Sequence, residues 1–160
     1  MNAETRESGS GHLQHIKDGV MRILAVDYGK KRTGLAVTDP SGIIASPLTT
    51  VETKDLERYI LDYLKIEQVA TIVIGYPRQP NGEDSDSMRY IRPFVARLRK
   101  VVPEAVAMEY YDERYTTKIA FQSMIDGGLG RKKRDNKNGI VDMVSASLIL
   151  QDYMEYKRCK

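Results

Sequence analysis

The sequence predicts an α/β fold with a mixed five-stranded sheet, in which three antiparallel strands precede two parallel strands and helices cover both faces. Between residues 21 and 52, short apolar runs are separated by turn signals, which is typical of hairpins. From residue 53 onward, segments with helical periodicity alternate with short apolar runs, and a helix between two strands implies a parallel crossover. The 160 residues, 41% of them hydrophobic, suffice for one domain with a core.

The first hairpin carries the first candidate site residue. A strand is predicted over Arg22–Val26, it stops at Asp27, and Gly29 with Lys30-Lys31-Arg32 forms a tight turn into a second strand, Thr33–Thr38. This places a carboxylate at the end of a buried strand, beside a glycine that lets another molecule come close. An Asp in this place is also a common turn former, so its role depends on whether other acids lie nearby.

The next elements change the period from strand to helix. A turn at Asp39–Gly42 leads to a third strand, Ile43–Val51, which Pro47 confines to an edge or a bend. Thr53 is expected to cap an amphipathic helix. The apolar run Val69–Gly75 then predicts a strand that is buried on both faces.

The second half repeats this alternation. The loop Gly75–Gly82 follows the fourth strand, and Ser85 or Ser87 is expected to cap a helix to about Lys100. A fifth strand, Ala105–Tyr111, runs directly into Asp112-Glu113-Arg114.

The C-terminal part is predicted to be helical with one basic interruption. Thr116 and Thr117 precede a helix to Asp126, and the charged segment Arg131–Asn138 is expected to be a loop. The last helix is predicted over Gly139–Tyr156, with small residues at its centre that allow close approach to the sheet. Its apolar stripe is predicted to contain Ile140, Val144, Leu148 and Gln151, with Val141, Ser145 and Leu148 beside it.

Composition indicates the extent of the domain and the cellular compartment in which it is expected. Residues 1–20 lack periodicity and are expected to be a flexible extension or an expression remnant, which leaves residues 21–157 as one domain. The single Cys159 cannot form an internal disulfide, and no apolar run approaches a membrane span or a signal peptide. We therefore expect a cytoplasmic protein with no membrane partner.

Acidic residues fall at the ends of several predicted elements. Asp27 ends the first strand, Asp112 and Glu113 end the fifth, and Asp142 lies in the first turn of the last helix. Sites in open α/β sheets gather at the carboxyl ends of the strands, where clustered carboxylates require a cation. Oxygen ligands without a His or Cys cluster favour Mg²⁺ or Mn²⁺. Taken alone, Asp142 is better explained as a charge that stabilises a helix N-terminus.

Such a cluster would suit phosphodiester cleavage, because two divalent ions can activate a water and stabilise the leaving oxygen. The net charge of +3 is too small to indicate a nucleic-acid-binding protein by itself. Two local basic segments could hold phosphates: Lys30-Lys31-Arg32, and the run Arg131, Lys132, Lys133 and Arg134. The second is equally explained as a solvated loop.

Four motifs in this order carry a resemblance to a known family: Asp27-Tyr-Gly-x-x-x-Thr33-Gly-x-Ala36, Gly75-Tyr-Pro-x-x-x-x-Gly82, Asp112-Glu113-Arg114-x-Thr116-Thr117, and Val141-Asp142-x-x-x-Ala146 with Leu150-Gln151. Over residues 21–156 the chain resembles the YqgF/RuvX family. The resemblance implies an RNase H-like fold and a nuclease that helps to form the 5′ end of 16S rRNA. The family is also described as a Holliday junction resolvase.

The resemblance also implies roles for individual residues. Asp27, one acid of the Asp112–Glu113 pair, and Asp142 would be the catalytic metal ligands, with Mg²⁺ or Mn²⁺ as two bound ions. Alternation along a strand points the adjacent acids to opposite sides, and we favour Glu113 as ligand with Asp112 as its orienter. Arg114 and Thr116 would support the site or contact a phosphate, although a structural ion pair explains Arg114 equally well.

Several alternatives remain open from the sequence. The substrate could be structured RNA, such as pre-16S rRNA or a pre-ribosomal particle, or branched DNA. A resolvase must cut two strands symmetrically and should be dimeric, but monomer and homodimer are not distinguished. The first hairpin is also similar to the phosphate-binding hairpin of actin-like ATPases, which need two such domains. A non-catalytic ribosome- or RNA-binding module is the remaining possibility.

Overall fold

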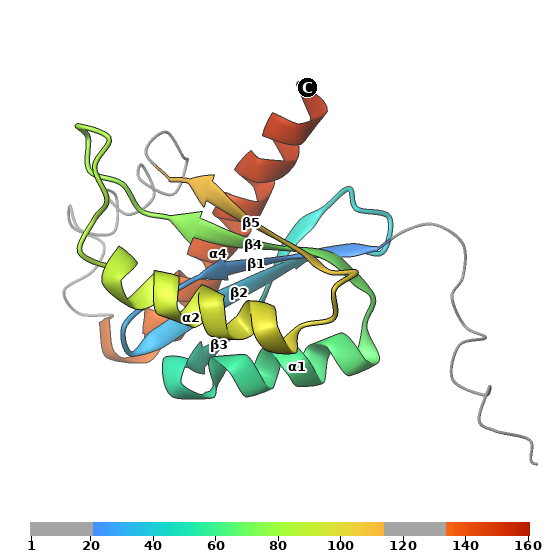
Figure 1. Ribbon diagram of the computed structural model, residues 1–160, viewed down its shortest axis with the longest axis horizontal. Coiled ribbons are helices and arrows are strands. Elements are labelled where there is room, and N and C mark those ends of the chain that lie inside the picture. Colours follow the sequence, from blue (N-terminus) through green and yellow to red (C-terminus); the bar gives the residue numbers. More distant parts are fainter. Residues whose placement is uncertain (1–20, 114–133) are drawn as a thin grey trace, which may run out of the picture.

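The computed structural model describes residues 21–113 and 134–160, which form one sheet between helices (Figure 1). The elements, in chain order, are β1 (Arg22–Asp27), β2 (Arg32–Thr38), β3 (Ala45–Glu52), the 3-10 turn η1 (Thr53–Asp55), α1 (Leu56–Ile66), β4 (Val69–Tyr76), α2 (Met88–Val101), β5 (Ala107–Asp112) and α4 (Arg134–Arg158). The predicted helix over residues 116–126 lies outside the described residues. No helix of the described part is long and apolar enough to cross a membrane.

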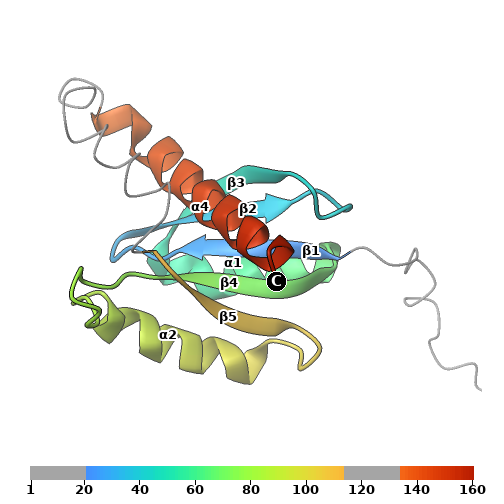
Figure 2. The ribbon, with the colours of Figure 1, turned by 90° about the horizontal axis from the view of Figure 1, so that it is seen from above.

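The sheet has the order β3-β2-β1-β4-β5. Strand β1 pairs antiparallel with β2, and β2 with β3, whereas β4 lies parallel to both β1 and β5. Helices α1 and α2 cover one face, and α4 crosses the other (Figures 1 and 2). The predicted mixed sheet with helices on both faces is confirmed.

Each face of the sheet has its own core. The face under α1 and α2 holds large side chains, among them Leu24, Ile60 and Phe94. The face under α4 is built from smaller residues next to the sheet, with Ala25, Ala36 and Ala146 fully buried. Small side chains allow a helix axis to lie close to a sheet, so the α4 backbone can approach the strands directly.

Three predictions about element ends and faces are wrong. Thr53 does not cap the helix, because α1 is preceded by Asp55 and the Thr53 hydroxyl instead donates to the Gly29 carbonyl at 2.6 Å. Residues 134–138 belong to α4 and not to a loop. The predicted apolar stripe of α4 is wrong, because Ile140 is half exposed and Ile149, Leu150 and Tyr153 are buried instead, whereas the small residues Ser145 and Ala146 are buried as expected.

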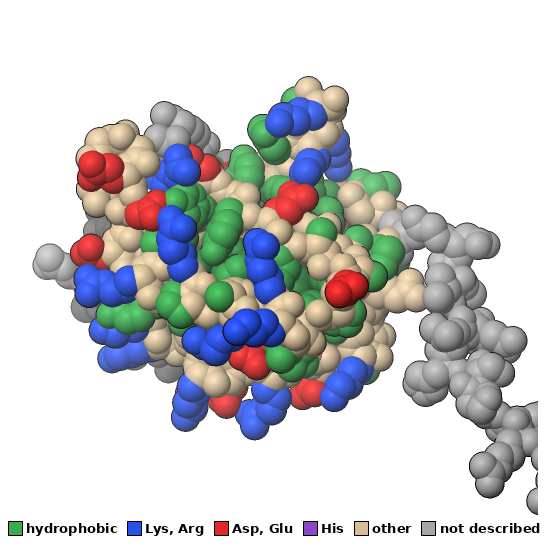
Figure 3. Space-filling model, viewed as in Figure 1, with side chains coloured by type: hydrophobic (Ala, Val, Ile, Leu, Met, Phe, Trp, Pro, Cys, Tyr) green, Lys and Arg blue, Asp and Glu red, His purple; other side chains and the backbone are tan. Residues whose placement is uncertain are grey.

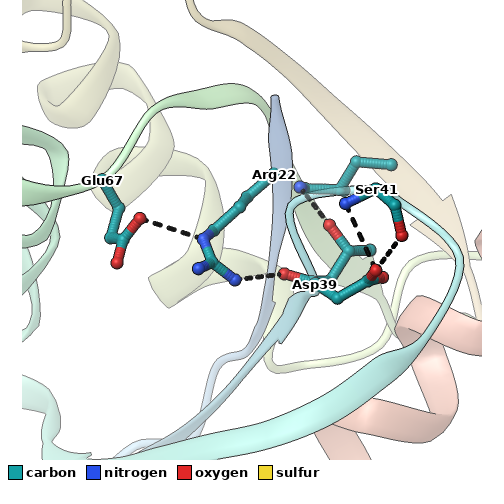
Figure 4. A network of polar contacts seen from close by, with 6 residues as sticks. Arg22, Asp39, Ser41 and Glu67 are labelled. Carbon is teal, nitrogen blue, oxygen red and sulfur yellow. Dashed lines mark hydrogen bonds and ion pairs between the residues drawn. The ribbon is translucent and has the colours of Figure 1, made fainter. Parts of the chain in front are cut away.

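A polar network closes the end of the sheet where β1 begins (Figure 4). Arg22 donates from Nε to Glu67 Oε2 at 3.1 Å and from Nη1 to the Thr38 carbonyl at 2.8 Å. In the next turn, the Asp39 carboxylate accepts the backbone N–H groups of Ile43 and Ile44 at 2.8 and 2.7 Å, and also bonds Ser41. These bonds join the start of β1 to the end of β2 and to the residue that follows α1.

The Asp39 turn predicts a pH dependence of stability. Hydrogen bonds, first from the Ile44 N–H and next from the Ser41 side chain, lower the pKa of Asp39 from 3.8 to about 2. A lowered folded-state pKa means that the charged form stabilises the fold above pH 3.8, and that this contribution is lost as the pH falls toward 2.

We expect Asp39→Ala to be less stable than the wild type by a constant amount above about pH 4, with the difference shrinking at lower pH. Urea unfolding between pH 7 and pH 2 measures it. A stability difference that is the same at pH 2 and pH 7 would contradict this assignment.

Candidate functional site

Three residues form a row across the sheet near its carboxyl-terminal edge. Asp27, the last residue of β1, pairs with Gly34 of β2. On the other side, Val26 pairs with Ile74 of the parallel strand β4, so Asp27 lies beside Gly75. A carboxylate therefore stands between two positions that have no side chain.

All three residues of the row face α4. Side chains of a strand alternate between faces, and the residues two positions before Asp27, after Gly34 and before Gly75 all lie in the core under α4. These three residues are Ala25, Ala36 and Val73. The Asp27 side chain and the two glycines thus share the α4 side of the sheet.

Asp142 reaches this row through the backbone of α4. A Cβ atom added to Gly34 would lie 1.9 Å from the Asp142 carbonyl oxygen and 2.8 Å from the Met143 nitrogen. No real side chain tolerates such distances, so only glycine permits the helix to lie here. Since Gly34 is the cross-strand partner of Asp27, the close approach brings Asp142 next to Asp27.

Glu113 reaches the row from the opposite side. Its N–H donates to the Tyr76 carbonyl at 3.2 Å, which extends the pairing of β5 with β4 by one residue. A Cβ atom added to Gly75 would lie 1.9 Å from Glu113 Oε1, so this carboxylate lies directly over Gly75. With 8% of its surface exposed, Glu113 is the only buried charged residue in the described part of the chain.

The adjacent acid, Asp112, lies on the other face. It pairs with Tyr76 across the sheet, and its carboxylate Oδ2 lies 3.9 Å from Arg78 Nη1. The Arg78 guanidinium also lies 4.6 Å from the centre of the Tyr76 ring. Of the two neighbouring acids, Glu113 is the one that shares the α4 side with Asp27.

The donor set and its position suit a hard divalent cation. Asp27, Glu113 and Asp142 offer only carboxylate oxygens, and they meet at one edge and one face of the sheet. Within residues 21–113 and 134–160, however, no group of three His, Cys, Asp or Glu side chains is arranged so that it could hold a metal ion. The carboxylates have to move closer together to bind an ion in common.

The predicted basic residues divide between the two sides of this edge. Arg32 lies on the α4 side, with its Nε 3.3 Å from Asp142 Oδ2. Lys30 lies over the ring of Tyr90 at the start of α2, with its Nζ 5.3 Å from the ring centre. Lys31 is exposed.

The other predicted nucleic-acid-binding residues lie wholly or partly outside the described region. Arg134 is the first residue of α4, but its side chain is not described. The remaining ones are outside the described residues: Arg114, Thr116, Arg131, Lys132 and Lys133.

Hydrogen bonds fix the turn that follows Asp27. The Thr53 hydroxyl bonds the Gly29 carbonyl at 2.6 Å and the Thr33 hydroxyl at 2.9 Å. A Cβ atom at Gly29 would lie 2.1 Å from the Arg32 carbonyl oxygen, so the turn requires glycine. Sequence reasoning assigned Thr53 to a helix cap and overlooked this role, because no local pattern relates residues 53 and 29.

Substitution of the two glycines beside Asp27 is expected to lower the stability by different amounts. Gly34→Ala meets helix backbone that cannot move alone, so we expect the free energy of unfolding to fall by about 1–3 kcal/mol. Gly75→Ala meets the ends of the Glu113 and Ile149 side chains, which can rotate, so we expect a loss below about 1 kcal/mol together with displacement of Glu113.

Gly139→Ala is the matched control for urea unfolding of both variants. Its added Cβ would lie 3.7 Å from Thr50 Cβ, an ordinary contact, and alanine is favoured over glycine within a helix by about 1 kcal/mol. Equal stability of Gly34→Ala and Gly139→Ala would refute the close approach of α4.

Comparisons with known proteins agree on the family. A family model described as RuvX, Holliday junction resolvase, matches residues 21–156. A protein from Phocaeicola vulgatus is 53% identical over 137 residues, covering 86% of this chain and 97% of the relative. One from Flavobacterium johnsoniae is 47% identical over 137 residues, covering 86% of this chain and 98% of the relative. Both are named "Putative pre-16S rRNA nuclease".

A solved structure has the same fold at low sequence identity. It is described as T. thermophilus RuvC in complex with Holliday junction substrate, and it matches with a TM-score of 0.52 and 16% identity. The match covers 86% of this chain and 96% of that chain. The likeness confirms the predicted RNase H-like fold.

Proposed function

The chain belongs to the RuvX family, and from this premise we propose that it is a metal-dependent nuclease that cleaves phosphodiester bonds in the 5′-end processing of precursor 16S rRNA. The observation that carries the proposal is the row at the edge of the sheet. Asp27 stands between two glycines, over which Asp142 and Glu113 approach from either side.

The three carboxylates are proposed to hold Mg²⁺ or Mn²⁺, with two ions as in other phosphodiester-cleaving sites. When bound, such ions activate a water for attack and neutralise charge on the leaving oxygen. Asp27 is held by the end of β1 and by the hydrogen-bonded turn after it, so it is the most fixed of the three. Glu113 and Asp142 are proposed to close onto it.

Arg32 is proposed to hold a phosphate of the substrate beside the carboxylates. Its guanidinium already lies 3.3 Å from Asp142 Oδ2, and its side chain is 45% exposed. Binding of a cation by Asp142 would weaken that ion pair and leave Arg32 available to a phosphate oxygen. Lys30 and Lys31 extend the positive charge along the same turn. Asp112, whose carboxylate lies 3.9 Å from Arg78 Nη1, is proposed to orient the neighbouring Glu113.

Holliday junction cleavage is the second candidate, because the family description and the structural relative both name it. The names of the relatives that are about half identical favour the ribosomal substrate. A resolvase would act as a dimer, since it must make two symmetrical cuts. Two measurements distinguish the candidate substrates. Sedimentation of the chain with a four-way junction shows whether a dimer binds the junction, and a cleavage assay on pre-16S rRNA shows whether that RNA is cut.

Replacing any one carboxylate by its amide tests the catalytic set. We expect Asp27→Asn, Glu113→Gln and Asp142→Asn each to lower Mg²⁺-dependent cleavage of pre-16S rRNA by roughly 100-fold or more, because each removes a charged ligand without changing its shape. Asp62→Asn, an exposed acid on α1, is the matched control and should keep full activity. Wild-type cleavage by a folded Asp27→Asn protein would rule the proposal out.

Metal binding is tested separately from cleavage by thermal unfolding with and without Mg²⁺ or Mn²⁺. At a metal concentration of about 100 times Kd, binding adds about 2.7 kcal/mol, which should raise Tm by roughly 8 °C. Asp142→Asn should show little of this rise, and Asp62→Asn all of it. If both variants respond as the wild type does, the ions bind elsewhere.

A further inference from the structure

A hollow of about 220 Å³ lies at the same edge of the sheet as Asp27 but on the opposite face. One wall is the turn after β1, from Tyr28 to Lys30, and the other is the start of α2, which includes Arg89 and Tyr90. Tyr28 packs on Phe94 of α2 with 5.2 Å between ring centres, whereas Asp27 faces α4. Asp27, the last residue of β1, and Tyr28, the next residue, thus line two different places.

The Tyr90 ring is the central feature of this hollow. It is 39% exposed, with Lys30 Nζ 5.3 Å and the Arg89 guanidinium carbon 5.7 Å from its centre. Asp86 also lines the hollow, 3.7 Å from Arg89, but its side chain is 95% exposed. The two cations exceed the one acid, so the hollow keeps a positive charge around an accessible aromatic ring.

The hollow opens on a face that carries further positive charge. Figure 3 shows the side of the molecule formed by α1 and α2, with Lys and Arg side chains along its left and lower margins. The left margin is the end at which β1 and β4 finish (Figure 1). A polyanion that reaches the carboxylates can therefore continue over this edge along a basic surface.

We propose that this hollow binds one unpaired nucleotide of the substrate, with its base against Tyr90 and its phosphate beside Lys30. The proposal rests on the proposed nuclease function and names the substrate class more closely: a strand that is single-stranded next to the bond that is cut. Arg89 on the ring adds the charge that completes the pocket.

The size and the chemistry of the hollow both fit an unpaired nucleotide. Pockets for drug-sized molecules are larger, about 300–1,000 Å³, so the space suits a single planar group. An aromatic ring beside cations is the usual platform for a nucleic-acid base, and it accepts any base because every base has a π-face. A base within a duplex has both faces covered by its neighbours and cannot use the ring.

The test compares binding of a 12-nucleotide single-stranded RNA containing 2-aminopurine with binding of the same sequence in a duplex. Both are measured in EDTA, so that no cleavage is needed. We expect Tyr90→Ala to weaken single-strand binding about tenfold and to change duplex binding by less than about twofold, because only an unpaired base can stack. Tyr90→Phe should bind as the wild type does, with the 2-aminopurine fluorescence equally quenched.

Two further variants make the outcome specific. Tyr156→Ala removes a ring of similar exposure, 45%, near the end of α4, and should not affect binding. Lys30→Gln should lower the affinity for single strands and reduce the slope of log K against log salt by about 1, as expected when one phosphate contact is lost.

Unchanged single-strand binding by a folded Tyr90→Ala protein would overturn the proposal, as would an equal loss on the duplex. The result is independent of catalysis. If the Asp27→Asn protein still cleaves, the proposal that these carboxylates carry the nuclease activity fails, while the binding data remain valid. If Asp27→Asn is inactive but Tyr90→Ala binds normally, only the nucleotide pocket is refuted.

Discussion

The contact between the α4 backbone and Gly34 is the constraint on which the site depends. Asp142 is far from Asp27 along the chain, and only the direct approach of helix backbone to strand backbone makes them neighbours. A methyl group at this position would lie within 2.8 Å of three backbone atoms, so α4 would have to move outward. The small buried residues Ala25, Ala36 and Ala146 continue the same close packing along the helix.

At one edge, the two faces of the sheet carry different groups of side chains. On the α4 side, carboxylates gather over two glycines, and Arg32 is the cation beside them. On the α2 side, Tyr90 and Lys30 form a hollow without a carboxylate cluster. Strand alternation causes this division, because neighbouring residues of β1 must point to opposite faces. A substrate that crosses the edge would meet the reacting groups on one face and a place for its base on the other.

Much of this arrangement was predictable from residue patterns, and the exceptions have different causes. Strand ends and the mixed sheet follow from local apolar runs and turn residues, whereas alternation placed Asp112 and Glu113 on opposite sides without deciding which of them faces Asp27. The apolar stripe of α4 was wrong because periodicity placed it through Ile140 and Leu148, whereas Ile149, Leu150 and Tyr153 are the buried apolar residues; the close approach of the small centre around Ser145 was expected. The Thr53–Gly29 bond and the Tyr90–Lys30 pair were missed because each joins residues that are distant in sequence.

The Ser145-Ala146 pair shows how stability and chemistry are linked in this fold. Ser145 is 2% exposed and Ala146 is fully buried. Both residues lie one turn after Asp142 on the helix that Gly34 admits, so their volume helps to set the distance between α4 and β1. A larger side chain at either position would push Asp142 away from Asp27 without touching a carboxylate. The packing of α4 on the sheet and the spacing of the acids are therefore set by the same contacts.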